Sequence, residues 1–142
     1  MKKNLLFLIA ACLLLASCNL FSNFGKKVSF GESEVYYKGD GVTEAEAKKL
    51  GDYLMEQKFF DKETPKSVQI TNDGGKYLVH FVVDKKKVTD GARLNWWKYQ
   101  YDISKDVFDG KPLQIILADD QLKDIEIMDL AEAILLAMPV QK

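Results

Sequence analysis

The sequence predicts an α+β fold, a two-layer domain in which an antiparallel sheet carries helices on one face. Two stretches with apolar residues at helical spacing alternate with short runs rich in β-branched and aromatic residues. The segment Asn72-Asp73-Gly74-Gly75 separates two of these runs and indicates a hairpin, because such residues tolerate positive φ. The chain has 142 residues, 47% of them apolar, which is enough for one core. We expect a single domain in the order β-α-β-β-α-β-β plus a C-terminal helix.

The predicted domain begins with one strand and one helix. Residues 28–38 carry β-branched and aromatic side chains and predict the strand, with a break in it near Gly31. Thr43 and Glu46 have the spacing of a capping box, in which each side chain accepts a hydrogen bond from the other residue's backbone N–H. Apolar residues then recur on one helical face, so we expect an amphipathic helix over residues 43–60.

The remaining elements are two hairpins and two helices. The run 77–84 is apolar on nearly both faces, which suits a central strand better than an edge strand. Thr89 is a suitable cap for the second helix, and Pro139 stops the C-terminal helix. The expected bounds are 66–71 and 77–84 for the first hairpin, 90–108 for the second helix, 113–118 and 122–128 for the second hairpin, and 129–138 for the C-terminal helix.

Two halves of this pattern look like a divergent internal repeat of a helix and a hairpin. Val42-Thr43-Glu44 matches Val88-Thr89-Asp90, and Phe60-Asp61 matches Phe108-Asp109, with similar offsets. Two units are too few for an open solenoid, so the repeat predicts a closed domain with one shared sheet. Chance similarity over such short matches is the alternative.

The N-terminal segment has the three parts of a signal peptide. Lys2 and Lys3 form a basic start, and the uncharged run 5–15 follows before the small residues that end the segment. About a dozen apolar residues are fewer than the roughly 20 that a membrane-spanning helix needs. We therefore expect residues 1–17 to be removed rather than retained as an anchor.

The quartet Leu15-Ala16-Ser17-Cys18 resembles the lipobox of bacterial lipoproteins. The resemblance implies cleavage between Ser17 and Cys18, and a lipid of the diacylglyceryl and palmitate kind on the Cys18 sulfur. Two or three acyl chains anchor a protein firmly to a membrane, at about 0.8 kcal/mol for each buried CH₂ group. An Asp after the cysteine would favour the inner membrane in enteric-type sorting, and Asn19 stands there instead. We expect the outer membrane, facing the periplasm or the surface, rather than the inner membrane.

The expected organisation is therefore a signal peptide (1–17), a lipidated cysteine with its tether (18–27) and one α+β domain (28–142). The tether is short and polar, and its Phe21 and Phe24 are placed to rest on the lipid surface. The domain itself contains no cysteine, which excludes disulfides and thiolate metal sites within it.

Nothing in the domain predicts an enzyme, a metal site or a cofactor. His80 is the single histidine, it lies in an apolar strand, and no motif supplies it with a nucleophile or with further metal ligands. Asp119-Asp120 could bind calcium weakly, but the spacing is not that of an EF-hand, and a hairpin turn is the better interpretation. The formal net charge is −1 and Arg93 is the single arginine, which disfavours nucleic-acid binding.

Residues 96–101 are the most unusual stretch of the domain. Trp96, Trp97, Tyr99 and Tyr101 give four aromatic residues in six positions, and a helix cannot place all four on one face. Trp97 and Tyr101 share one face and Trp96 shares another with Tyr99, so one pair is expected to cover the sheet while the other is partly exposed. The exposed pair would be a binding surface, since Trp and Tyr are common interface anchors. The alternative is that all four only cover a broad sheet.

The whole pattern resembles small envelope lipoproteins with a domain of this order. The function that we expect is a membrane-anchored envelope lipoprotein with a non-catalytic protein- or peptide-binding module, whose partner is another envelope protein. The alternative is a lipoprotein that binds a small molecule or a lipid between its helices and its sheet. The sequence does not reveal the oligomeric state.

Overall fold

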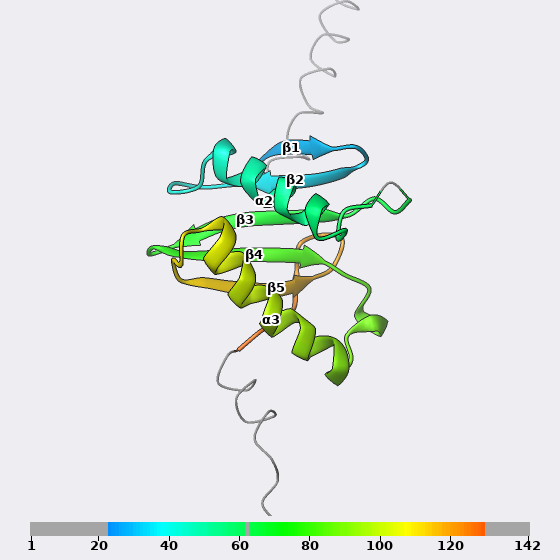
Figure 1. Ribbon diagram of the computed structural model, residues 1–142. Coiled ribbons are helices and arrows are strands. Elements are labelled where there is room, and N and C mark those ends of the chain that lie inside the picture. Colours follow the sequence, from blue (N-terminus) through cyan, green and yellow to red (C-terminus); the bar gives the residue numbers. More distant parts are fainter. Residues whose placement is uncertain (1–22, 62, 130–142) are drawn as a thin grey trace, which may run out of the picture.

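The structure is a computed structural model that describes residues 23–61 and 63–129 (Figure 1). The expected signal peptide, Cys18 and nearly all of the expected C-terminal helix lie outside these residues. Within the described ranges, no helix is long and apolar enough to cross a membrane.

The described chain forms six strands, two α-helices and one short 3₁₀-helix, η2. The strands are β1 (Lys26–Phe30), β2 (Ser33–Tyr37), β3 (Ser67–Asp73), β4 (Lys76–Val82), β5 (Leu113–Ala118) and β6 (Asp124–Ile127). The helices are α2 (Glu44–Glu56), η2 (Lys85–Lys87) and α3 (Asp90–Val107). This content confirms the α+β class.

The expected single strand over residues 28–38 is wrong, because two strands occupy this segment. Gly31 has a φ of +65°, a left-handed conformation that glycine adopts without strain. The chain reverses there, and Phe30 pairs with Ser33 in an antiparallel β1–β2 hairpin. The order along the chain is consequently β-β-α-β-β-α-β-β.

The expected fully antiparallel sheet is also wrong, because the six-stranded sheet is mixed. Its strands lie in sequence order, from β1 at one edge to β6 at the other. The three hairpins are antiparallel, whereas β2 pairs with β3 and β4 pairs with β5 in parallel. A helix separates the strands of each parallel pair and returns the chain to the starting end of the sheet, so the next strand runs in the same direction.

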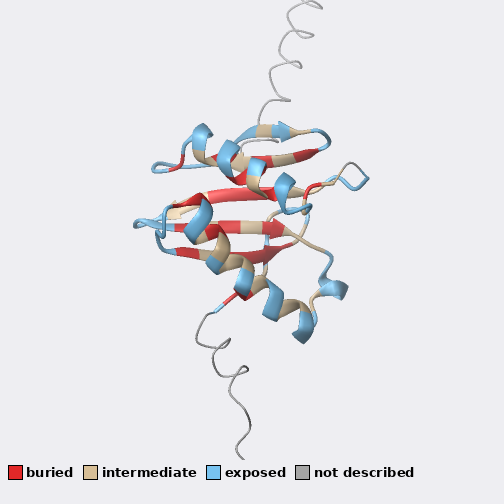
Figure 2. Ribbon diagram, in the orientation of Figure 1, coloured by how far each residue is buried: buried red, intermediate tan, exposed pale blue. Residues whose placement is uncertain are grey.

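Both α-helices lie on the same face of the sheet, as expected (Figure 1). Helix α2 packs on β1 and β2, and α3 packs on β5. The core lies between these helices and the strands, where the buried residues gather on the inner side of each element (Figure 2). The strand side chains of this core include Val35, Val68, Ile70, Val79, Phe81, Ile115 and Leu117.

Helix α2 begins at a complete capping box. The backbone N–H of Thr43 donates to Glu46 Oε2 at 2.8 Å, and the backbone N–H of Glu46 donates to Thr43 Oγ1 at 3.2 Å. The helix ends four residues earlier than expected, since Lys58 adopts a φ of +58°. The backbone N–H groups of Phe59 and Phe60 then both donate to the carbonyl of Leu54, which closes the helix end. After this turn, the side chains of Phe59 and Phe60 point in different directions.

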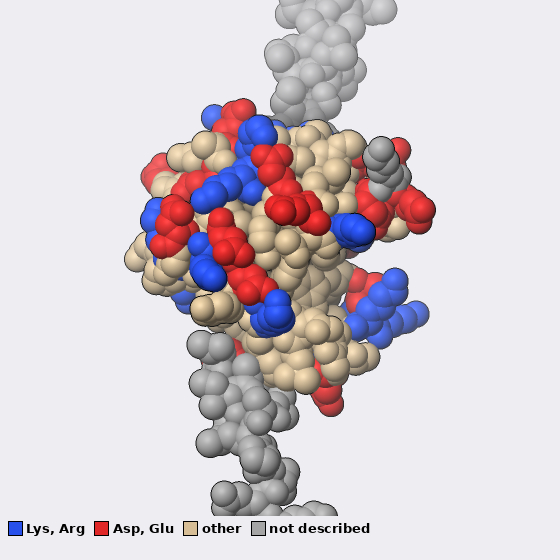
Figure 3. Space-filling model, viewed as in Figure 1, with Lys and Arg blue, Asp and Glu red and all other residues tan. Residues whose placement is uncertain are grey.

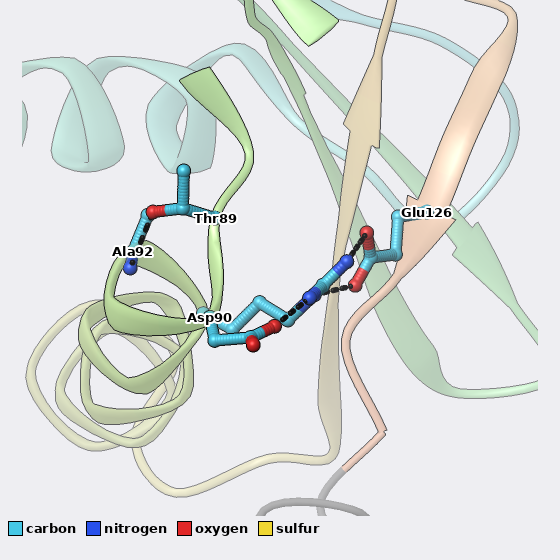
Figure 4. Close-up of polar contacts among 5 residues, drawn as sticks. Thr89, Asp90, Ala92 and Glu126 are labelled. Carbon is cyan, nitrogen blue, oxygen red and sulfur yellow. Dashed lines mark hydrogen bonds and ion pairs between the residues drawn. The ribbon is translucent and has the colours of Figure 1, made fainter. Parts of the chain in front are cut away.

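Helix α3 is fixed to the far edge of the sheet by Arg93. Its guanidinium donates to Glu126 on β6 through Nε at 2.5 Å and Nη2 at 3.0 Å, and through Nη1 to Asp90 (Figure 4). Thr89 caps the same helix by accepting a hydrogen bond from the backbone N–H of Ala92 at 3.4 Å. The N-terminal half of α3 is therefore tied to β6.

Candidate functional site

The four predicted aromatic residues of α3 do not form one surface. Trp97 is only 5% exposed and belongs to the core, whereas Tyr101 is 67% exposed. Trp96 and Tyr99 are half-buried and pack against the edge of the core. The expectation that Trp97 and Tyr101 are buried or exposed together is thus wrong. The rotation of α3 against the sheet places the Trp97 side chain in the core and the Tyr101 side chain in solvent.

Trp96 and Tyr99 meet aromatic side chains from three other elements. The Trp96 ring lies 4.9 Å from the Phe81 ring of β4 and 6.1 Å from the Phe59 ring, measured between centroids. Phe59 also contacts Phe81 edge-on at 5.2 Å. Tyr99 lies 6.0 Å from Tyr53 of α2. Tilted and edge-on pairs of this kind each add about 0.5–1.5 kcal/mol beyond their buried area, so the cluster is a rigid floor.

A groove between α2 and α3 opens over this floor. One cavity of about 240 Å³ is lined by Gln57, Phe59, Asn95, Trp96 and Tyr99. A second cavity of about 440 Å³ extends toward η2, and its lining includes Val88 and Ala92 as well as Phe59 and Trp96. Because both cavities share Phe59 and Trp96, they are neighbouring compartments of one depression, which we call the interhelical groove.

Phe59 is the central residue that sequence reasoning missed. The residue was expected inside a helix, but it lies after the early end of α2, where the left-handed Lys58 turns the chain. Phe59 is half-buried while Phe60 is 2% exposed. The signal available was the pair of phenylalanines just before Asp61, since one helix face cannot bury both neighbours.

Tyr99 lines the groove with its ring, whereas its hydroxyl is buried. This hydroxyl has no hydrogen-bond partner in the described part of the chain. Burial is the main cause that raises the pKa of Tyr99, with the charges of Tyr53 and Asp102 adding to it. The hydroxyl is therefore protonated at neutral pH, and its burial keeps it out of contact with solvent in the groove.

A lysine approaches the groove from the strand side. Lys66 Nζ lies 5.5 Å from the centre of the Phe59 ring, a cation–π arrangement, and forms an ion pair with Asp61. The pKa of Asp61 is lowered, chiefly by its hydrogen bond from Lys66. The larger cavity is consequently apolar on its floor and charged at its rim.

His80 lies away from the groove. Its strand neighbours Val79 and Phe81 point into the core, so His80 faces the opposite side of the sheet, 12% exposed. Nε2 lies 3.5 Å from Asp124 Oδ1, and Nδ1 is buried without a partner in the described residues. Burial lowers the pKa of His80, against the opposing charge of Asp124.

The described residues include no group of three or more His, Cys, Asp or Glu side chains placed to hold a metal ion. Asp119, which the sequence left between calcium binding and a turn, accepts hydrogen bonds from the backbone N–H groups of Gln121 and Lys123 at 3.0 and 2.9 Å. This is the Asx-type pattern of a hairpin turn.

Comparison with known families gives one match. Residues 27–130 match the family model AF_1994_N, described as a family N-terminal domain. The chain belongs to the AF_1994_N family. The match runs from β1 through β6, so the interhelical groove lies entirely within the AF_1994_N domain. No curated protein matches the chain, and no solved structure matches it.

Proposed function

We propose that this chain is a lipoprotein of the bacterial cell envelope whose AF_1994_N domain is a non-catalytic module that binds a protein or peptide partner in the interhelical groove. The observation that carries the proposal is the pair of half-buried rings, Phe59 and Trp96, which divide two open cavities over a rigid aromatic floor. Aromatic anchors in partly formed pockets dominate the energetics of most protein interfaces.

The geometry supports a protein partner more than an enclosed small molecule. The second compartment, at about 440 Å³, falls within the roughly 300–1,000 Å³ usual for drug-sized ligands, but it is open rather than enclosed. The more apolar compartment is also open and measures only about 240 Å³. A compartment of this size suits one large side chain. Its rim carries amide groups, Gln57 and Asn95, that are suited to a peptide backbone.

The lipid anchor is supported by the sequence of residues 1–18. We propose that Cys18 carries the lipid and that the domain faces the periplasm or the surface from the outer membrane. Labelled palmitate should enter the wild-type chain and should not enter Cys18→Ser, and the labelled chain should sediment with outer-membrane fractions. Equal labelling of both chains would contradict the assignment of Cys18.

The binding function is tested by photo-crosslinking in living cells. A photoreactive amino acid at Asn95, on the rim of the groove, should give a specific adduct with another envelope protein. The same amino acid at Tyr101, which is exposed on α3 but lines neither cavity, is the matched control.

The aromatic anchors give the second arm of this experiment. Trp96→Ala should remove the adduct formed from position 95 while circular dichroism shows an intact fold. An adduct that survives Trp96→Ala, or equal adducts from positions 95 and 101, would contradict the proposal. A Trp96-dependent small-molecule adduct in native mass spectrometry, without any protein adduct, would favour the alternative ligand class.

A further inference from the structure

The interhelical groove continues beyond the two aromatic compartments. A third cavity, of about 370 Å³, lies between the C-terminal halves of α2 and α3. It shares Gln57 with the smaller aromatic compartment. Its lining comprises Lys49, Asp52, Tyr53, Glu56, Gln57, Asp106 and Val107. The groove is therefore a chain of three compartments along α3, the third of which is also lined by α2.

The end of the groove formed by this third cavity is acidic. Glu56 of α2 and Asp106 of α3 line it from opposite sides, and neither forms an ion pair with another described residue. The pKa of Tyr53 is raised by its burial and further by the negative charges of these carboxylates and of Asp102. Two unpaired carboxylates thus act on the same point between the helices.

The opposite end of the groove is basic. Lys87 lines the compartment next to η2, and the neighbouring Lys86 is exposed. Neither lysine forms an ion pair with another described residue. The single acid in this lining, Asp84, accepts a hydrogen bond from the backbone N–H of Lys86 at 3.0 Å. Figure 3 shows the basic group at the place of η2 beside an uncharged surface between the helices.

We propose that the groove binds an extended acidic–apolar–basic segment of a partner protein in one direction. An acidic residue of the segment lies at Lys86 and Lys87, a large apolar side chain lies against Phe59 and Trp96, and a basic residue lies at Glu56 and Asp106. The inference rests on the proposed function and adds to it the chemistry and the direction of the ligand.

The dimensions of the groove agree with a short segment. Helix α3 has 18 residues, and at a rise of about 1.5 Å per residue it is roughly 27 Å long. An extended peptide rises about 3.3 Å per residue, so roughly eight residues cover this length. Charges at the two ends would then fix which way the peptide lies, since like charges face each other in the reverse direction.

The basic end does not suit an anionic membrane surface. The first described residues of the chain lie beside β1, and η2 lies on the far side of the domain, near the start of α3 (Figure 1). In a protein tethered through Cys18, the lysines of η2 would therefore face away from the membrane. Their charge is available to a protein segment.

The experiment selects ligands from a phage-displayed library of random peptides, using the full chain reconstituted in phosphatidylcholine nanodiscs. The wild-type chain should enrich peptides with an acidic residue on one side of an aromatic or aliphatic residue and a basic residue on the other. The double variant Lys86→Glu with Lys87→Glu should select a basic residue where the wild type selects an acidic one, and should leave the rest of the peptide unchanged. The double variant Glu56→Lys with Asp106→Lys should select an acidic residue where the wild type selects a basic one, and should leave the rest of the peptide unchanged. Each inversion should weaken the wild-type peptide roughly tenfold, as expected for two reversed surface charges.

Lys26→Glu with Lys105→Glu is the matched control, because both lysines are exposed and neither lines the groove. These variants should select the same peptides as the wild type. Peptides whose binding depends on Trp96 but whose charged residues follow no fixed order would overturn this inference and leave the proposed function standing. Peptides whose binding is the same in both charge-reversal variants would do the same. A selection with no peptide dependent on Trp96 would overturn the proposed function itself.

Discussion

Helices α2 and α3 connect their strands in the same way, but they pack on the sheet differently. Each joins two parallel neighbouring strands, and each begins at a threonine cap. Helix α2 approaches the β1–β2 hairpin so closely that a Cβ at Gly51 would lie 2.0 Å from ring carbons of Phe30. At Gly91 of α3, a Cβ would meet nothing within 4 Å. Gly91 is exposed in the first turn of α3, so the close approach at mid-helix is a feature of α2, whereas α3 has two cavities beside its N-terminal half.

The difference separates a supporting half of the domain from the half that carries the proposed binding groove, which we call the binding half. The 13 residues of α2 bury four side-chain positions in a row of helical spacing, Ala47, Leu50, Gly51 and Leu54. The 18 residues of α3 bury only Trp97, Ile103 and Val107, and its N-terminal half is held to β6 by Arg93. The N-terminal half of α3 is thus held by the ion pair between Arg93 and Glu126. Its Trp96 and Tyr99 side chains line the groove.

The largest effect that we expect comes from a cavity in the close-packed half. Leu54 is 0% exposed, and Leu54→Ala should lower the free energy of unfolding by about 3 kcal/mol, because the lost apolar contacts leave a cavity that the helix cannot close. Trp96→Ala, in the open half, should lower it by less, about 2 kcal/mol, because the side chain is half exposed before the change but gives up three ring contacts.

Urea unfolding followed by circular dichroism measures both values. Leu94→Ala is the control for α3, since Leu94 is 52% exposed and lines none of the groove compartments. A loss for Trp96→Ala as large as that for Leu54→Ala would mean that Trp96 belongs to the core, and would contradict the division into a supporting and a binding half.

The local elements in both halves were easier to predict from the sequence than their arrangement. The capping box of Thr43 and Glu46 is a local pattern, and it forms as predicted. Strand β5 has the predicted bounds, since its ends are set by Pro112 on one side and by polar residues on the other. Strand directions were not predictable in this way, because they depend on how the helices cross the sheet. The internal repeat stays a prediction.

The binding half depends on contacts between distant residues. The groove needs Phe59, which leaves α2 through the left-handed Lys58, to meet Trp96 across the domain. No local pattern predicts that meeting. The aromatic run 96–101 identified the correct helix, but the division between buried Trp97 and half-buried Trp96 depends on how α3 is rotated against the sheet.

The two caps provide a second, smaller test of the comparison. Thr43 takes part in a reciprocal box, whereas Thr89 makes a single contact of 3.4 Å with the backbone of Ala92. Thr43→Ala should cost about 1 kcal/mol, in the usual range for a helix cap, and Thr89→Ala about half of that. Chemical denaturation of the two variants measures the difference. Equal losses would mean that the second cap is as strong as the box.

The smallest expected effect is a loss of folding stability at acidic pH, and it should appear in the binding half. Burial lowers the pKa of His80 below 6.5, so the folded state favours the neutral ring more than the unfolded state does. The stability that this provides is complete above pH 6.5 and is lost as the pH falls through the lower folded pKa. The carboxylates with lowered pKa values, such as Glu34, start from 4.5 and lose their contribution at more acidic pH.

Hydrogen exchange between pH 7 and 5 can locate this loss. Protection should fall first in β4 and β6, which carry His80 and Asp124, while β1 and β2 stay protected. His80→Gln should remove the change over this interval, because no group remains to take up the proton. Asp124→Asn should enlarge the acid loss and extend it to lower pH, since the carboxylate is what raises the pKa of His80 against burial. Equal loosening of all six strands in the wild type would mean that the domain responds to acid as one unit, and the distinction between the two halves would then hold for packing alone.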